Sequence, residues 1–200
     1  MRFISRVMTP ALETERLFLK PLALADAKPI QKLFPRWEIV RYLNAAIPWP
    51  YPADGARTFI ERVLPEMERG ESFFWTLRAK TAPQQLIGVI SLFLKKEENR
   101  GFWMDPEWQG KGLMTEACDA VTAFWFDVLK QPLLRAPKAL VNEASRRISW
   151  KQGMRVVSRE ERDYVIGRLP SEIWEITADE WRARQQMSFR HKREQDTRGS

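Results

Sequence analysis

The sequence predicts a mixed α/β domain, built on a twisted and mostly antiparallel sheet of six to seven strands flanked by helices. Several short segments alternate apolar and polar residues, which is typical of half-buried strands. Longer segments repeat apolar residues at the spacing of an amphipathic helix. Three strand-like segments follow one another between two groups of helices, and this order favours antiparallel pairing over a parallel array.

Alternation and breakers define the elements expected in the first half of the chain. Leu17 and Leu19 alternate with polar neighbours, and Gly70 follows an apolar stripe that Phe59, Val63 and Met67 would form on a helix. We therefore expect a strand over residues 13–21, helices over 24–34, 36–43 and 53–69, a Pro-rich loop over 45–51, and strands over 72–78 and 86–94.

The second half contains the longest predicted helix, over residues 111–129. Pro137 interrupts the strand expected just after it, and Gly153 is suited to end the helix that follows that strand. The expected elements are strands over 101–104, 133–141, 154–157 and 173–176, a helix over 143–152, and a last helix that a capping box at residues 177–180 opens and that ends near Gln185.

A chain of 200 residues with 44% hydrophobic content can bury one full core. We expect one domain over residues 11–185, a short N-terminal extension over 1–10 and a basic, disordered tail over 186–200. A single Cys and a single His exclude an internal disulfide and most zinc chemistry, so no metal site is expected.

The net charge of +7 is concentrated at the two ends of the chain. Arg2 and Arg6 contribute +2 and the tail another +2, so the body carries only about +3. This makes nucleic-acid binding an unlikely role, whereas it suits a phosphate-rich cofactor. No apolar run approaches the ~20 residues that span a bilayer, and the start lacks a signal-peptide pattern, so we expect a cytoplasmic protein without membrane association.

The segment Gln109-Gly110-Lys111-Gly112-Leu113-Met114 stands between a predicted strand and the long helix. Glycines let a ligand approach the backbone closely, and the first turn of a helix offers free N–H groups and a positive dipole end. These properties indicate a phosphate site, with Lys111 adding charge. The segment is not a P-loop, because no Ser or Thr follows the lysine. Taken alone, it fits an ordinary strand-to-helix turn equally well.

A second segment, from Asn142 to Gly153, opens and closes a helix. Asn142 suits the N-cap and Gly153 the C-terminal position, so this segment alone indicates nothing beyond a helix. Together, in this order, the two segments make the chain resemble the GNAT superfamily of N-acetyltransferases, in particular the branch with the ribosomal-protein N-terminal acetyltransferases. The resemblance spans residues 11–184, and it rests on Gln109–Thr115, Glu116, Ala117, Asn142, Ser145, Lys151, Gly153 and the opening segment Leu12–Leu17.

The resemblance implies direct transfer of an acetyl group from acetyl-CoA to a primary amine in a ternary complex. It implies cofactor contacts from Trp103, Met104, Gln109, Gly110, Lys111, Gly112, Leu113, Met114, Thr115, Asn142 and Lys151. A backbone N–H at about Trp103 or Met104 would bind the carbonyl oxygen. Ser145 would be the general acid, or would only bond backbone in its helix, and Asn142 would orient pantetheine or a water.

Glu160, in a loop expected after the sixth strand, is a candidate general base or else a solvated surface charge. Three positions depart from the family pattern: Met114 replaces Gly or Ala, Met154 replaces Phe, and Ser149 replaces a Tyr that acts as acid in many members. Pro137 marks either a bulge or the strand that splays away from its neighbour in this fold.

Tyr42, Trp49 and Tyr51 flank the Pro-rich loop and form a candidate acceptor pocket, unless they only fix the loop to the core. The acceptor would be a protein N-terminus or a small-molecule amine, and a homodimer is possible in this family. The alternative function is a non-catalytic acyl-CoA-binding or RNA-associated module.

Overall fold

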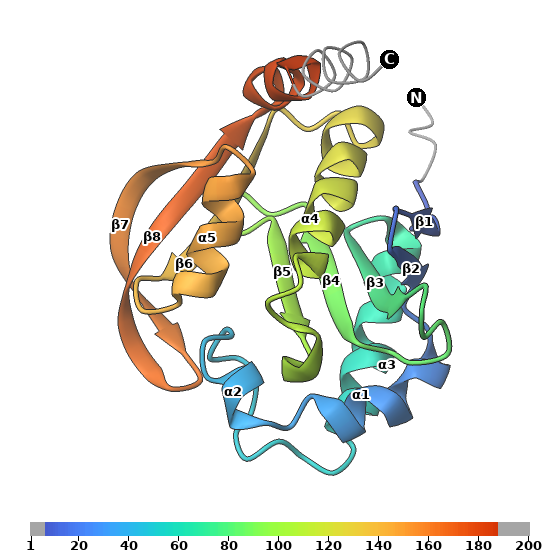
Figure 1. Cartoon of the computed structure of the whole chain (residues 1–200). Coiled ribbons are helices and arrows are strands. Elements are labelled where there is room, and N and C mark those ends of the chain that lie inside the picture. The colour runs from blue at the N-terminus through green and yellow to red at the C-terminus, as the bar shows by residue number, and fades with distance from the viewer. Residues whose placement is uncertain (1–6, 188–200) are drawn as a thin grey trace.

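The computed structural model describes residues 7–187 and contains two antiparallel sheets that lie side by side (Figure 1). The first sheet has the strand order β1-β2-β3-β4-β5 and the second the order β6-β8-β7. The strands are β1 (Leu12–Glu13), β2 (Leu17–Pro21), β3 (Ser72–Ala79), β4 (Gly88–Phe93), β5 (Arg100–Met104), β6 (Leu133–Ala139), β7 (Arg155–Tyr164) and β8 (Gly167–Thr177).

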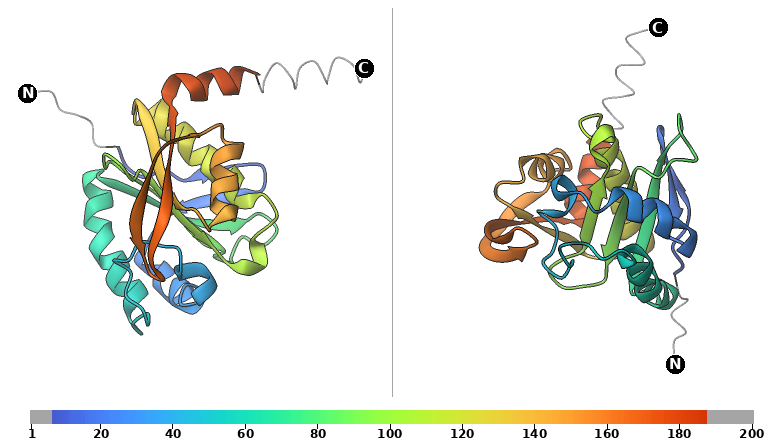
Figure 2. Two further views of the ribbon diagram at one scale, coloured as in Figure 1. Left: turned by 90° about the vertical axis from the view of Figure 1, so that its left-hand side faces the viewer. Right: turned by 90° about the horizontal axis from the view of Figure 1, so that it is seen from below.

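Helices cover both faces of the sheets, with α4 and α5 on one side and α3 on the other (Figure 2). The helical elements are η1 (Leu24–Asp26), α1 (Ala27–Leu33), α2 (Trp37–Val40), α3 (Gly55–Arg69), η2 (Pro106–Trp108), α4 (Leu113–Ala123), the π-helical turn η3 (Phe124–Val128), α5 (Glu143–Lys151) and a helix over 178–187.

Alternation along the central strands divides the core into two clusters. Phe73 and Trp75 of β3 pack with α4, whereas Phe74, between them, packs with α3. Successive side chains of a strand point to opposite faces, so the apolar run of β3 serves both layers. The sheet is therefore buried on both sides, and its position relative to α4 is fixed.

Asn99 joins the two sheets at one end of the space between β5 and β6. Its N–H donates to the carbonyl of Arg135 at 2.8 Å, and its Oδ1 accepts from the N–H of Arg135 at 2.6 Å. Its Nδ2 donates to the carbonyls of Phe93 and Lys95. The side chain is buried, so β5 and β6 are paired at this point and diverge beyond it.

Pro137 lies on the diverging side of β6. The backbone N–H and C=O groups of successive residues in β6 point alternately to its two sides. Those of Arg135 face Asn99, whereas the N–H of Leu140 bonds the β8 side. The backbone of Pro137, two residues after Arg135, therefore faces β5. No strand pairs with β6 there, and the missing N–H of proline removes no ladder bond. The interpretation of Pro137 as part of a splayed strand is confirmed.

The prediction was wrong for the region after α5, where β7 and β8 form a long hairpin in place of two short strands and a loop. β7 is an edge strand with exposed charges, which pairs Arg159 and Arg155 with Glu172 and Glu175 of β8. Charged edge strands are a common protection against aggregation, but they hide the apolar alternation that indicates a strand.

The fold class and the order of the other elements are confirmed. The strand expected over 13–21 is divided into β1 and β2, and the long helix begins at Leu113 and changes to the turn η3 at Phe124. Thr177 and Glu180 form the predicted capping box. Most of the N-terminal extension and of the basic tail lies outside the described residues. Between residues 7 and 187, no helix is both long and apolar enough to cross a bilayer.

Replacing Asn99 by Ala should lower the free energy of unfolding by ~2–4 kcal/mol, because it leaves the buried N–H of Arg135 and two carbonyls without partners. Urea unfolding monitored by tryptophan fluorescence measures the change. Asn99→Asp keeps an acceptor for Arg135 but loses both donors, so it should also destabilise. A loss below ~0.5 kcal/mol in N99A would mean that Asn99 does not hold the sheets together.

Candidate active site

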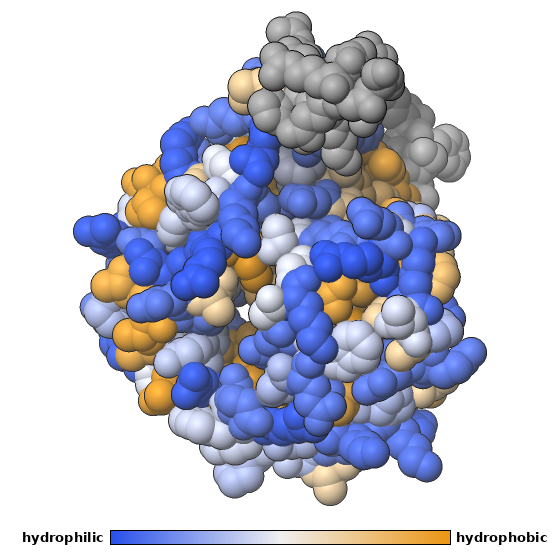
Figure 3. Space-filling view, in the orientation of Figure 1, coloured by the Kyte–Doolittle hydropathy of each residue, from blue (hydrophilic) through white to orange (hydrophobic). Residues whose placement is uncertain are grey.

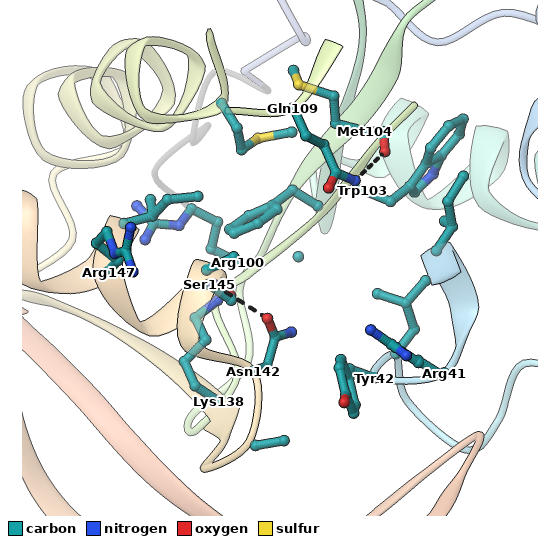
Figure 4. A pocket seen from close by; sticks show the side chains of 18 of the residues that line it. Arg41, Tyr42, Arg100, Trp103, Met104, Gln109, Lys138, Asn142, Ser145 and Arg147 are labelled. Carbon is teal, nitrogen blue, oxygen red and sulfur yellow. Dashed lines mark hydrogen bonds between the residues drawn. The ribbon is translucent and has the colours of Figure 1, made fainter. Parts of the chain in front are cut away.

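A cavity of about 430 Å³ lies where β5 and β6 diverge. Its walls come from these two strands, the N-terminal end of α4, helix α5, residues 38–44 and the end of β7. Figure 4 shows Asn142 and Ser145 on one side of the cavity and Arg41 and Tyr42 on the opposite side. On the face seen in Figure 3, hydrophobic residues form small areas separated by hydrophilic ones.

The cavity brings together twelve residues that the sequence assigned to the site. They are Tyr42, Trp103, Met104, Gln109, Gly110, Gly112, Leu113, Met114, Thr115, Asn142, Ser145 and Lys151. Four others do not line it: Lys111, Trp49, Tyr51 and Glu160.

The loop before α4 has the geometry of an anion cradle. Gly110 and Gly112 adopt φ values of 75° and 78°, where a side chain would be strained, and Gly112 is the N-cap of α4. Gln109 Nε2 donates to the carbonyl of Met104 at 2.9 Å and so fixes the loop to the end of β5. Lys111 does not line the cavity, and its Nζ lies 4.9 Å from the centre of the ring of Trp108, which does.

The start of α4 is held by the segment between β1 and β2. Glu116 accepts hydrogen bonds from Thr14 Oγ1 at 2.6 Å and from Arg16 Nε at 2.7 Å, and Arg16 Nη1 also donates to the carbonyl of Lys111 at 3.0 Å. Burial opposes ionisation of Glu116, but these hydrogen bonds outweigh it and lower the pKa of the carboxyl. The cradle is therefore held from outside the cavity.

Two backbone amides of β5 face the space between the strands. The N–H of Asp105 donates to the carbonyl of Ile87, so the backbone of Asp105 faces the β4 side of the sheet. Backbone direction alternates along a strand, so Trp103, two residues earlier, also faces β4. Phe102 and Met104 alternate with Trp103, so their N–H groups point towards β6. This excludes the amide of Trp103 from the predicted role. Its ring packs on Phe34, at 5.2 Å between centroids.

Helix α5 begins with the predicted N-cap, because Asn142 Oδ1 accepts from the N–H of Ser145 at 3.2 Å. Ser145 is 8% exposed and lines the cavity, and within residues 7–187 its hydroxyl has no hydrogen-bond partner. Ser149, one turn later, is fully buried outside the cavity wall. The residue that replaces the family's Tyr thus does not reach the site.

Two buried cations line the cavity, and neither has a carboxylate partner among residues 7–187. Arg100 donates to Thr122 Oγ1 at 2.9 Å and to Met154 Sδ at 3.5 Å, while its Nε has no partner among the described residues. Lys138 Nζ lies 4.5 Å from the centre of the Phe102 ring. Burial, and next to it the charge of Arg100, lowers the pKa of Lys138 from 10.5 to about 7.

The acceptor side differs from the predicted aromatic wall. Tyr51 packs edge-on against Phe34 at 5.0 Å, and burial raises its pKa to about 12. Trp49 packs on Trp37 at 5.5 Å, so these two rings fix the Pro-rich loop. Of the three predicted rings only Tyr42 lines the cavity, and Arg41 and Tyr164 lie there with it.

Glu160 does not occupy a loop beside the site. It lies in the exposed strand β7, outside the cavity lining, and pairs with Arg162 at 2.8 Å. An exposed carboxylate that pairs with an arginine and does not line the cavity is not positioned to act as a general base there. The alternative interpretation, a solvated surface charge, fits this position.

The model of one protein family, described as the acetyltransferase (GNAT) domain, matches residues 16–155. The chain belongs to this family. It is therefore an acetyl-CoA-dependent N-acetyltransferase, and the predicted enzyme class and cofactor are confirmed.

One curated relative and two solved structures are similar to this GNAT acetyltransferase. The uncharacterised N-acetyltransferase YoaA of Bacillus subtilis (strain 168) is 26% identical over 73% of the chain and 83% of its own length. The ribosomal-protein-S5-alanine acetyltransferase of Vibrio fischeri superposes with a TM-score of 0.74 at 16% identity, over 86% of the chain and 98% of its own. The ribosomal L7/L12 α-N-protein acetyltransferase RimL, in complex with coenzyme A, superposes with a TM-score of 0.74 at 13% identity, over 86% of the chain and 99% of its own.

The sequence did not indicate several cavity residues of the acetyltransferase, among them Arg100, Lys138, Arg41 and Tyr164. Arg100 and Lys138 could have been found, because each is a charged residue on the otherwise apolar, core-facing side of its strand. Arg41 and Tyr164 had no local signal. They line the same cavity because residues 41–45 are hydrogen-bonded to the tip of the β7–β8 hairpin.

Replacing Lys138 by Met should stabilise the acetyltransferase more at pH 6 than at pH 9, by ~2 kcal/mol. The pKa of Lys138 is depressed in the folded state to about 7 from 10.5, so between these values the amine is neutral in the folded state and charged in the unfolded state, and the wild type loses stability as pH falls. Urea unfolding at both pH values measures the difference. The exposed Lys32→Met is the control, and an equal effect of K138M at both pH values would contradict the expectation.

Proposed function

We propose that the enzyme transfers the acetyl group of acetyl-CoA directly to a primary amine while both substrates occupy the cavity. The observation that carries this proposal is the continuity of a single cavity. It joins the glycine cradle at α4, the unpaired amides of Phe102 and Met104, and Ser145 to a separate wall at Arg41 and Tyr42. Donor and acceptor could therefore meet without a covalent enzyme intermediate.

On the donor side, the N–H groups at the start of α4 would bind the pyrophosphate, with Gly110 and Gly112 allowing its close approach. Lys151 lines the same cavity from α5 and would add charge. Pantetheine would lie between β5 and β6, where the amides of Phe102 and Met104 and the backbone of Pro137 face no paired strand.

At the reacting centre, the N–H of Phe102 or Met104 would donate to the thioester oxygen as negative charge develops. Ser145 would protonate the departing thiolate, and the Nδ2 of Asn142 stays available to orient the donor, since its Oδ1 caps α5. An α-amino group has a pKa near ~8 and is partly neutral at pH 7, so a strong base is not required. Burial raises the pKa of the Cys118 thiol, which disfavours a thiolate nucleophile.

For the acceptor, a protein or peptide N-terminus is the class we favour over an isolated small amine. The relatives from V. fischeri and the RimL protein are named for acetylation of ribosomal proteins, and they share the fold over 86% of the chain. The cavity also extends to the exposed Asn44 and to Asp163 at its rim, which leaves room for a chain beyond the amine.

Replacing Gly112 by Ala should weaken acetyl-CoA binding at least ~tenfold, because a side chain at φ 78° strains the N-cap and turns the first N–H groups of α4 from the phosphate. Gly70→Ala is the matched control, since Gly70 has φ 70° at the end of α3, outside the cavity lining. Calorimetric titration measures the affinity of each variant. Equal affinities in both variants would remove the cradle from donor binding.

Replacing Ser145 by Ala should lower kcat by ~10²-fold with little change in the KM for acetyl-CoA, because a general acid acts only in the transition state. Ser149→Ala, in the same helix but outside the cavity lining, should keep wild-type kinetics. Thiol release with an N-terminal peptide panel measures both. Ser145 has no part in the chemistry if S145A keeps the wild-type kcat across pH 6–9.

A further inference from the structure

Arg41 is held in place by the backbone around it. Its carbonyl accepts from the N–H of Ile166 at 3.1 Å, and the carbonyl of Leu43 accepts from Val165 at 3.0 Å. The segment after α2 is thus clasped by the tip of the β7–β8 hairpin. The guanidinium also lies over the ring of Tyr42, at 4.7 Å from its centre, so a planar charged group is presented at a defined orientation.

Arg41 forms no ion pair or side-chain hydrogen bond within residues 7–187, and its Nε is shielded from solvent without a partner. Another arginine of the cavity differs in this respect. Arg162, in the same cavity, pairs with Glu98 and Glu160. A shielded guanidinium nitrogen without a partner is costly in the free protein, and an anionic ligand would remove that cost.

The acid nearest to Arg41 in its own helix does not fill this role. Glu38 lines the cavity one turn earlier, but it is exposed and lies beyond 4.0 Å from any Arg or Lys nitrogen of the described residues. Asp163, at the end of β7, faces Arg168 at 3.9 Å. Solvent screens the charges of both carboxylates, so neither neutralises Arg41, and the guanidinium is available to bind an anion.

We propose that Arg41 binds a carboxylate of the acceptor, so that the preferred substrates are amines that carry a carboxylate a short distance from the reacting nitrogen. Arg41 and Tyr42 lie across the cavity from Asn142 and Ser145 (Figure 4). An amine directed towards Ser145 would therefore place its substituent against Arg41. The planar fork of guanidinium matches a carboxylate with two parallel hydrogen bonds. This inference rests on the proposed acetyl transfer.

Two sources of carboxylate fit this site, and matched substrate pairs separate them. Alanine against alaninamide tests the α-carboxylate of a free amino acid. Ala-Asp-Gly-amide against Ala-Asn-Gly-amide tests an acidic side chain next to a peptide N-terminus. We expect the wild type to prefer the carboxylate in one pair by ten- to a hundredfold in kcat/KM, which is the usual value of a charged hydrogen bond.

Arg41→Gln should abolish this preference, so that the two substrates of each pair differ by less than about threefold in kcat/KM. Arg41→Lys should keep part of it, because the charge remains without the fork. Arg62→Gln is the control, since Arg62 also lies over an aromatic ring, 5.7 Å from the centre of Phe59, but outside the cavity lining. It should keep the full preference.

The inference is overturned if the wild type shows no preference in either pair, or if R41Q keeps it. Acetyl-CoA turnover with every amine at equal efficiency contradicts only the carboxylate site, whereas binding of acetyl-CoA without thiol release on any amine contradicts the proposed function. A second readout does not need turnover. N-acetyl-alanine should raise the Tm of the wild type more than N-acetyl-alaninamide, or the acetylated Asp peptide more than its Asn counterpart, and R41Q should lose that difference.

Discussion

The pairing of β5 and β6 at a single buried residue sets the rest of the structure. Asn99 bonds Arg135 through both its backbone and its side chain, and beyond this point the two strands diverge. The amides of Phe102 and Met104 and the backbone of Pro137 are left without a sheet partner. Buried backbone groups without partners would be costly in a core, so the fold is coherent only if this space stays open to water or to a ligand. The active site is thus a consequence of how the sheets are joined.

The sequence was sufficient to predict an element of the fold wherever a local pattern of residues indicated it. Helix α3 shows its apolar stripe and the left-handed Gly70, α5 shows its N-cap Asn142, and the cradle shows glycines directly before a helix. Each signal depends on residues within a few positions of one another, and their φ values and caps are local properties. The proposed donor side consists mainly of such elements, which is why most of the residues predicted for it lie together in one cavity.

The acceptor side depends on contacts between distant segments, and the sequence did not reveal them. Strand β7 has charges on both faces, so no alternation marks it, and its pairing with β8 decides where Arg41 and Tyr164 lie. The aromatic residues of the Pro-rich loop were a reasonable expectation, but composition alone cannot tell whether a ring faces a cavity or a core. Tyr51 is used to pack on Phe34 instead.

Charge connects the two sides of the cavity. Arg100 and Lys138 are buried without an anion, and such cations cost several kcal/mol in a low-dielectric environment. The depressed pKa of Lys138 relieves part of this cost, and the phosphates of the donor would offset more of it. In the proposed reaction, the same positive potential would disfavour an ammonium ion in the cavity and would lower the pKa of a bound acceptor amine. The neutral amine is the nucleophile that acetyl transfer requires, which means that buried cations can promote the reaction without a carboxylate base.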